Sequence, residues 1–197
     1  MMQTWKPDSP LNPQRRKRHG SIALPTCTAT PLILSPAFDL DRFAALSRSQ
    51  PNDDMETREL AETWCRWRRH LRAYRIDCRG ERGSWLLLWL EPVVERNMED
   101  AWSASPLRGY LLDMLAASLV MAAAESMIPE LASLGCAPVP EPHPAIRGVA
   151  FELGLNWTGP GALDRRYAMV TALPYAGGCE SCSLCADCPR LRGAATA

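Results

Sequence analysis

Four cysteines near one end of the sequence have a spacing that suits metal chemistry. Two residues separate each of them from the next, so the four thiols fall within ten positions: Cys179, Cys182, Cys185 and Cys188. Thiolates ligate iron–sulfur clusters and structural zinc, and short loops between such ligands point backbone amides at the sulfur atoms. The spacing therefore predicts one metal or cluster site built from these four residues.

Three kinds of site remain open for this run. Bacterial ferredoxin-type runs space their cysteines by two, two and three residues and place Pro after the last one; here the last gap is two residues and Pro189 follows. Zinc modules also use four thiolates, although most of them place a longer loop between two cysteine pairs. Adjacent Cys-x-x-Cys pairs also form redox-active disulfides. We interpret the run first as the ligands of a 4Fe-4S cluster, with zinc and metal-free thiols as the alternatives.

The other cysteines and the histidines give no second site. Isolated cysteines are usually small buried hydrophobes or unreactive thiols, and this is our expectation for the four scattered ones: Cys27, Cys65, Cys78 and Cys136. His70 lies among arginines and His143 lies in a proline-rich stretch, so neither supports a catalytic triad or a histidine metal site. The catalytic residues of any enzymatic reaction are therefore not identified.

The composition is that of a folded globular chain. Of its 197 residues, 47% are hydrophobic and 22% are charged, which is ordinary for a globular domain. The formal charge is zero, so neither nucleic acid nor a membrane is an expected partner on charge alone. Pro25 and Pro31 interrupt the apolar stretch after the basic run at Arg15, which favours a cytoplasmic location; a twin-arginine export signal is the alternative.

Hydrophobic spacing predicts helices and strands in the first half of the body. A short helix is expected from Phe38 to Leu46. A second helix follows, with large apolar residues at helical spacing: Leu60, Trp64, Trp67, Leu71 and Tyr74. Two apolar runs joined by a glycine turn, 74–78 and 85–90, predict a hairpin, and a polar helix is expected from Pro92 to Asp100.

The second half is expected to contain the central helix and two more strands. Ser105 and Pro106 begin the longest apolar segment, for which Gly135 supplies a stop. Its stretch 110–128 approaches membrane-spanning length, but Asp113 and Glu125 favour a buried core helix. A proline-rich connector over 136–144 and strands over 151–157 and 167–173 complete the prediction.

These elements predict an α+β fold, in which mixed helices and an antiparallel sheet surround the long helix and a cysteine-rich tail follows. We divide the chain into a basic, proline-rich flexible arm (1–35), an α+β domain (36–175) and a metal-binding or cluster-binding tail (176–197).

The order of elements also resembles a known family. The run Leu107-Arg-Gly-Tyr-Leu-Leu-Asp-Met-Leu-Ala-Ala-Ser118 is similar to the central helix of the activation domain of vitamin B12-dependent methionine synthase, particularly of its small stand-alone relatives. Phe38-Asp-Leu-Asp-Arg-Phe43 and Arg72-Ala-Tyr-Arg75 resemble the entry region of that domain. The end of the stand-alone forms is similar to Leu173-Pro174 leading to Cys188-Pro-Arg-Leu-Arg192.

The resemblance implies an α+β domain that contacts a corrinoid protein and helps to reactivate it with an external electron donor. The chain would then be an iron–sulfur accessory protein for a cobalamin-dependent methyltransferase such as methionine synthase. The alternative is an interaction module stabilised by zinc and without redox activity. The family also uses S-adenosylmethionine, but its Arg-x-x-x-Gly-Tyr motif has no counterpart over 140–149. No S-adenosylmethionine ligand is therefore carried over.

Overall fold

The computed structural model describes residues 26–48, 54–80, 83–134, 137–138, 141–159 and 162–175, together with Gly178, Cys179, Cys182, Ser183, Cys185 and Cys188. The helices are α1 (Leu40–Ser47), α2 (Asp54–Trp67), a short 3-10 turn (Arg68–His70), α3 (Pro92–Ala104), α4 (Pro106–Met127), α5 (Glu130–Leu134) and α6 (Pro144–Glu152). The strands are β1 (Cys27–Pro31), β2 (Leu71–Cys78), β3 (Ser84–Leu90), β4 (Trp157–Gly159), β5 (Ala162–Leu163) and β6 (Ala168–Leu173).

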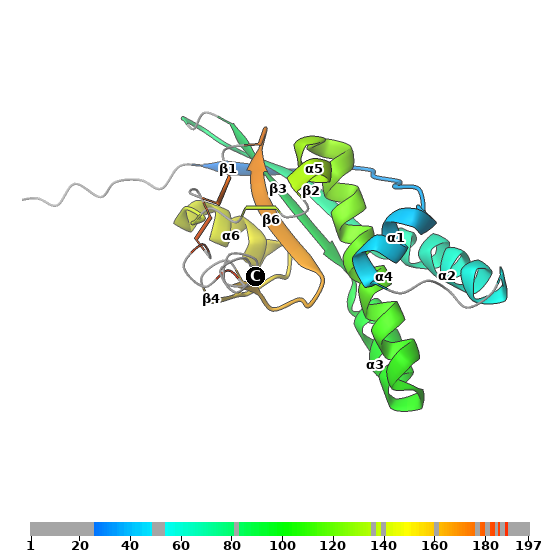
Figure 1. Ribbon diagram of the computed structural model, residues 1–197. Coiled ribbons are helices and arrows are strands. Elements are labelled where there is room, and N and C mark those ends of the chain that lie inside the picture. The colour runs from blue at the N-terminus through cyan, green and yellow to red at the C-terminus, as the bar shows by residue number, and fades with distance from the viewer. Residues whose placement is uncertain are drawn as a thin grey trace, which may run out of the picture.

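The main sheet has four antiparallel strands in the order β1-β2-β3-β6. Helices α1 to α5 lie on one side of it, and α6 with the small β4-β5 pair lies on the other (Figure 1). Because side chains alternate along a strand, Leu86 and Leu88 of β3 face the first group whereas Leu87 and Trp89 face α6. The continuous apolar run of β3 is thus explained by burial on both faces, and the α+β prediction is confirmed.

Helix α4 is the central core helix that the sequence predicted. The side chain of Ser105 caps its N-terminus by accepting from the Arg108 backbone N–H, and Pro106 occupies the first turn. Leu115 and Leu119 are fully buried against the sheet and the other helices. Among the described residues, α4 is the one helix long and apolar enough to cross a membrane, but most of its apolar window is buried in the body. The helix ends at Met127, before the stop that we predicted at Gly135.

The second helix is shorter than its apolar spacing predicts. Trp64 and Trp67 are buried in the core as expected, and the Trp64 indole donates to the Pro36 carbonyl at 3.0 Å. The helix ends at Trp67, however, and Leu71 and Tyr74 belong to β2. Pairing with β3 over the whole of β2 prevails over the helical spacing of these two residues, because a strand between two partners satisfies its backbone groups on both sides.

Several elements in the structure were not predicted, among them α6, β1 and β5. The strand expected over 151–157 is wrong, because α6 extends to Glu152 and Trp157 is the one residue of that stretch in β4. His143 caps α6, since its Nδ1 accepts from the Ala145 backbone N–H at 3.2 Å, and Pro144 begins the helix. Strand β1 lies inside the segment that we assigned to the flexible arm, yet it pairs with β2 along its length.

Helices α3 and α4 approach most closely where glycine replaces a side chain. A Cβ on Gly109 would lie 2.3 Å from the Trp102 ring and 2.8 Å from its Cα. Because the backbone of α3 cannot yield as a flexible side chain does, we expect Gly109→Ala to push the two helices apart. The expected loss of unfolding free energy is about 1–3 kcal/mol.

Gly148→Ala on α6 is the matched control. Its Cβ would meet no atom within 4 Å, and replacing an exposed helical glycine by alanine stabilises a helix by about 0.5–1 kcal/mol. Chemical denaturation of both variants measures the contrast. Equal stabilities would contradict the close approach of α3 and α4.

Candidate functional site

The four tail cysteines are joined by a chain of tight turns. The backbone N–H of Cys182 donates to the Cys179 carbonyl at 3.2 Å, Cys185 donates to Cys182 at 3.0 Å, and Cys188 donates to Cys185 at 3.3 Å. Each cysteine thus begins a turn that closes on the next one. A single hydrogen bond of this kind closes a turn of four residues. The bonds therefore show three successive turns, one for each interval between cysteines.

The four thiols are not gathered around one point. Within the described residues, no group of three or more Cys, His, Asp or Glu side chains is arranged to hold a metal ion. Cys179 is exposed and Cys188 is half-buried. Four thiols are a donor set that fits a thiolate-bound group, whereas a common centre stays a prediction.

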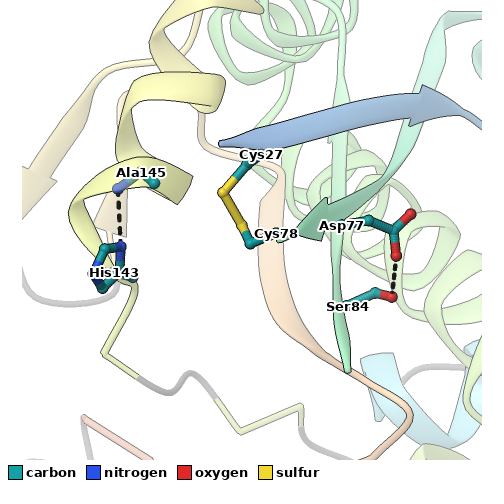
Figure 2. Close-up of a disulfide and its surroundings, with 6 residues drawn as sticks. All are labelled: Cys27, Asp77, Cys78, Ser84, His143 and Ala145. Atoms are coloured by element: carbon teal, nitrogen blue, oxygen red, sulfur yellow. Dashed lines mark hydrogen bonds between the residues drawn. A yellow bond between two sulfur atoms is a disulfide. The ribbon is translucent and has the colours of Figure 1, made fainter. Parts of the chain in front are cut away.

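A disulfide joins two of the scattered cysteines. Cys27 at the start of β1 is bonded to Cys78 at the end of β2, directly opposite in the strand register (Figure 2). The expectation that both are ordinary buried thiols is therefore wrong. The pairing could not be found from the sequence, because β1 was not predicted and 51 positions separate the two residues. Cys65 is an exposed thiol on α2, and Cys136 lies outside the described residues.

This disulfide bears on the expected cytoplasmic location. Disulfides persist in oxidising compartments and are rare in the reducing cytosol. Cys78 is buried in the core between the sheet and α6, where solvent-borne reductants have little access. The cytoplasmic location stays a prediction, and the redox state of this pair in the cell is the observation that bears on it.

Two polar clusters on the body have structural roles. At the end of the β2-β3 pair, Glu91 Oε2 lies 2.7 Å from His70 Nδ1, and Glu91 Oε1 accepts from Arg72 Nε at 2.7 Å. His70 precedes β2, Arg72 lies within β2 and Glu91 follows β3, so these bonds connect the two strands at this end. The hydrogen bond from His70, together with the hydrogen bond and charge of Arg72, lowers the pKa of Glu91.

The second cluster connects α4 to the start of β6. The Tyr167 hydroxyl donates to Asp113, which also pairs with Arg166 at 2.9 Å. Burial raises the pKa of the Tyr167 phenol, and the hydrogen bond to Asp113 raises it further. The other carboxylate of α4, Glu125, is buried and accepts from Arg42 of α1. The two carboxylates that argued against a membrane span thus anchor α4 to its neighbours.

The comparisons with known proteins give no relative to place beside this geometry. No protein-family model, no curated protein and no solved structure matches the chain. The resemblance to the methionine synthase activation domain therefore stays a prediction.

We expect the disulfide to contribute measurably to the free energy of unfolding. Closing a loop across 51 positions is worth about 4 kcal/mol in the chain-entropy model. We expect the double variant Cys27→Ala/Cys78→Ala to lose up to this amount in chemical denaturation, whereas Cys65→Ser on α2 leaves stability unchanged. Peptide mapping after alkylation without reduction checks the bond itself, and labelling of both Cys27 and Cys78 would contradict it.

The Glu91 cluster predicts a pH-dependent contribution. Because the folded-state pKa of Glu91 is lowered, its contribution is complete above the unfolded-state pKa, about 4.3, and is lost as the pH falls through the folded-state value. Glu91→Gln should therefore lower the melting temperature at pH 7, by the equivalent of about 1 kcal/mol for these half-exposed bonds. The difference should shrink below pH 4 or so.

Glu99→Gln, at an exposed position of α3, is the control for this series. It should follow the unmodified protein over the whole pH range. A Glu91→Gln deficit that stays constant down to the lowest pH would show that lost packing, and not the ionised carboxylate, is responsible.

Proposed function

We propose that this protein is an iron–sulfur protein that transfers single electrons through a cluster held by Cys179, Cys182, Cys185 and Cys188. The observation that supports the proposal is the series of three consecutive turns, each spanning one cysteine interval. This repeat places four thiols at regular intervals in a short segment, and four thiolates are the usual ligand set of a 4Fe-4S cluster. Among the described residues no metal-binding group is already assembled, and this includes the four cysteines.

The residues of this chain would do three things for such a cluster. The thiolates would hold the iron, and their negative charges would bias the cluster toward its oxidised state. Backbone N–H groups of the turns that point at sulfur would favour the reduced state. When bound, the cluster supplies reversible one-electron chemistry. Binding of a cluster would bring the four sulfur atoms together, because they form no metal-holding group in this structure.

We further propose a corrinoid protein as the electron acceptor, specifically a cobalamin-dependent methyltransferase such as methionine synthase, with a separate reductase as donor. Support for this partner comes from the resemblance of the α4 sequence and of the segment around Arg72–Arg75 to the activation domain. The α+β body with its buried central helix agrees with that class of domain at the coarse level.

A zinc-stabilised interaction module is the second candidate, and the same donor set favours it. Four thiolates also make a closed tetrahedral zinc site. The two candidates differ in what the purified protein contains, because zinc contributes neither colour nor sulfide. They differ again in what chelation does, since removal of a structural zinc unfolds the segment that it holds.

Anaerobic purification tests the proposal. We expect a brown protein with about four iron and four acid-labile sulfide per chain, and an electron paramagnetic resonance signal after chemical reduction. Cys182→Ser and Cys185→Ser should lose most of the iron, because each removes one ligand. Cys65→Ser, an exposed cysteine on α2, is the matched control and should retain the full content.

Two outcomes would overturn the iron–sulfur assignment. One is a colourless protein without iron or sulfide, even after anaerobic reconstitution with ferrous iron and sulfide. The other is one zinc per chain whose chelation abolishes folding of the tail, which establishes the second candidate. The corrinoid partner is tested separately, by following reduction of protein-bound cob(II)alamin in absorbance. An intact cluster that reduces a flavodoxin or a dye but not the corrinoid protein would reject the partner alone.

A further inference from the structure

Most of the exposed apolar side chains in the described part of the chain lie around one end of α4. Four of its seven exposed large hydrophobic residues belong to this group: Leu46, Met55, Leu107 and Tyr110. They come from the end of α1, the start of α2 and the first turns of α4. We call this group the α4-end patch.

Specific contacts connect the members of the α4-end patch. The Tyr110 hydroxyl donates to the Ser47 carbonyl at 2.6 Å, which holds Leu46 beside α4. Met55 and Leu107 line the same surface hollow of about 300 Å³ between α2 and α4. Leu107 and Tyr110 are three residues apart and therefore lie on one side of α4. Trp102 of α3 packs over Gly109 on a different side of α4 and is not part of the patch.

The sheet cannot cover this surface. Figure 1 shows the α3–α4 pair extending well past the ends of β2 and β3, so that its tip projects from the body. Farther along α4, the sheet and the other helices cover the apolar side chains, and Leu115 and Leu119 are fully buried. In the first turns of α4, Gly109 and Leu111 are buried, whereas Leu107 and Tyr110 are exposed, so one apolar side of this part of the helix is available for a partner.

We propose that the α4-end patch is the interface of a two-fold symmetric dimer of this chain. The patch contains both signs of charge, since Glu59 of α2 and Arg108 of α4 form an ion pair at 3.0 Å with both side chains more than half exposed. In a two-fold contact the same surface meets itself. Arg108 of each copy can therefore approach the Glu59 carboxylate of the other.

Charge favours a second copy over the other occupants. The chain has no net charge, so two copies do not repel one another at long range. An anionic membrane attracts surfaces rich in cations, whereas Glu56 and Glu59 line the hollow beside Arg108. Tyr is enriched at the centres of protein interfaces, and Tyr110 belongs to the patch. The dimer does not depend on the proposed cluster, because this patch and the cysteine run are separate parts of the chain.

Sedimentation of the full chain over a concentration series tests the dimer. We expect a dimer in the micromolar range, and Met55→Glu should raise its dissociation constant at least about tenfold. Phe151→Glu is the matched control, because Phe151 has the same exposure as Met55, 69%, but lies on α6. It should leave the dissociation constant unchanged.

Charge exchange tests the two-fold contact. Arg108→Glu and Glu59→Arg should each weaken the dimer several-fold, whereas an equimolar mixture of the two variants should recover most of the loss, because the mixture restores the opposite charges between copies and not within a copy. Circular dichroism establishes that each variant is folded.

A pure monomer at concentrations up to about 100 micromolar overturns the proposal. A dimer equally weakened by Phe151→Glu also overturns it, as does a dimer that is entirely disulfide-linked on a non-reducing gel. Monomer that cosediments with phosphatidylcholine vesicles through Met55 would assign the patch to a membrane surface instead.

Discussion

Burial of β3 on both faces is the constraint on which the rest of the body depends. Because β3 pairs with β2 on one edge and β6 on the other, its backbone groups are satisfied within the sheet, and its side chains are free to fill two separate cores. One core needs the long α4 to close it, and the other needs α6. A polar substitution on either side of this strand would leave an unsatisfied group beside a closely packed layer.

The helical layer depends on a few polar contacts as well as on apolar packing. Apolar packing alone fixes poorly how far a uniformly apolar helix such as α4 rotates about its axis or slides along its neighbours. The bond from half-buried Arg42 to buried Glu125 and the bond from Tyr167 to Asp113 fix both, since each requires one position of α4 relative to α1 and β6. A charge left without its partner in such a place is strongly destabilising.

Local signals allowed much of the body to be predicted. Asp39 and Ser105 cap helices where the sequence placed helix starts, and the glycine turn before Ser84 joins the predicted hairpin. Long-range pairing could not be predicted in the same way. Nothing near Cys27 indicates a strand, because its pairing partner in β2 is distant in the sequence. The prolines before α6 are typical of an extended connector, so the start of that helix at Pro144 was not predicted. The cysteine spacing predicted a candidate ligand set but not its geometry, which depends on how the run bends.

The disulfide between β1 and β2 also affects the exposed edge of the sheet. Strand β1 is an outer strand, and an outer strand offers unpaired backbone groups to any other extended chain. This strand is short, ends in Pro31, which has no amide hydrogen to donate, and is covalently fastened at its first residue. A clamped edge of this kind resists both fraying and strand exchange between molecules. The Cys27–Cys78 bond therefore keeps β1 from separating and leaving the edge of β2 open, in addition to stabilising the native fold.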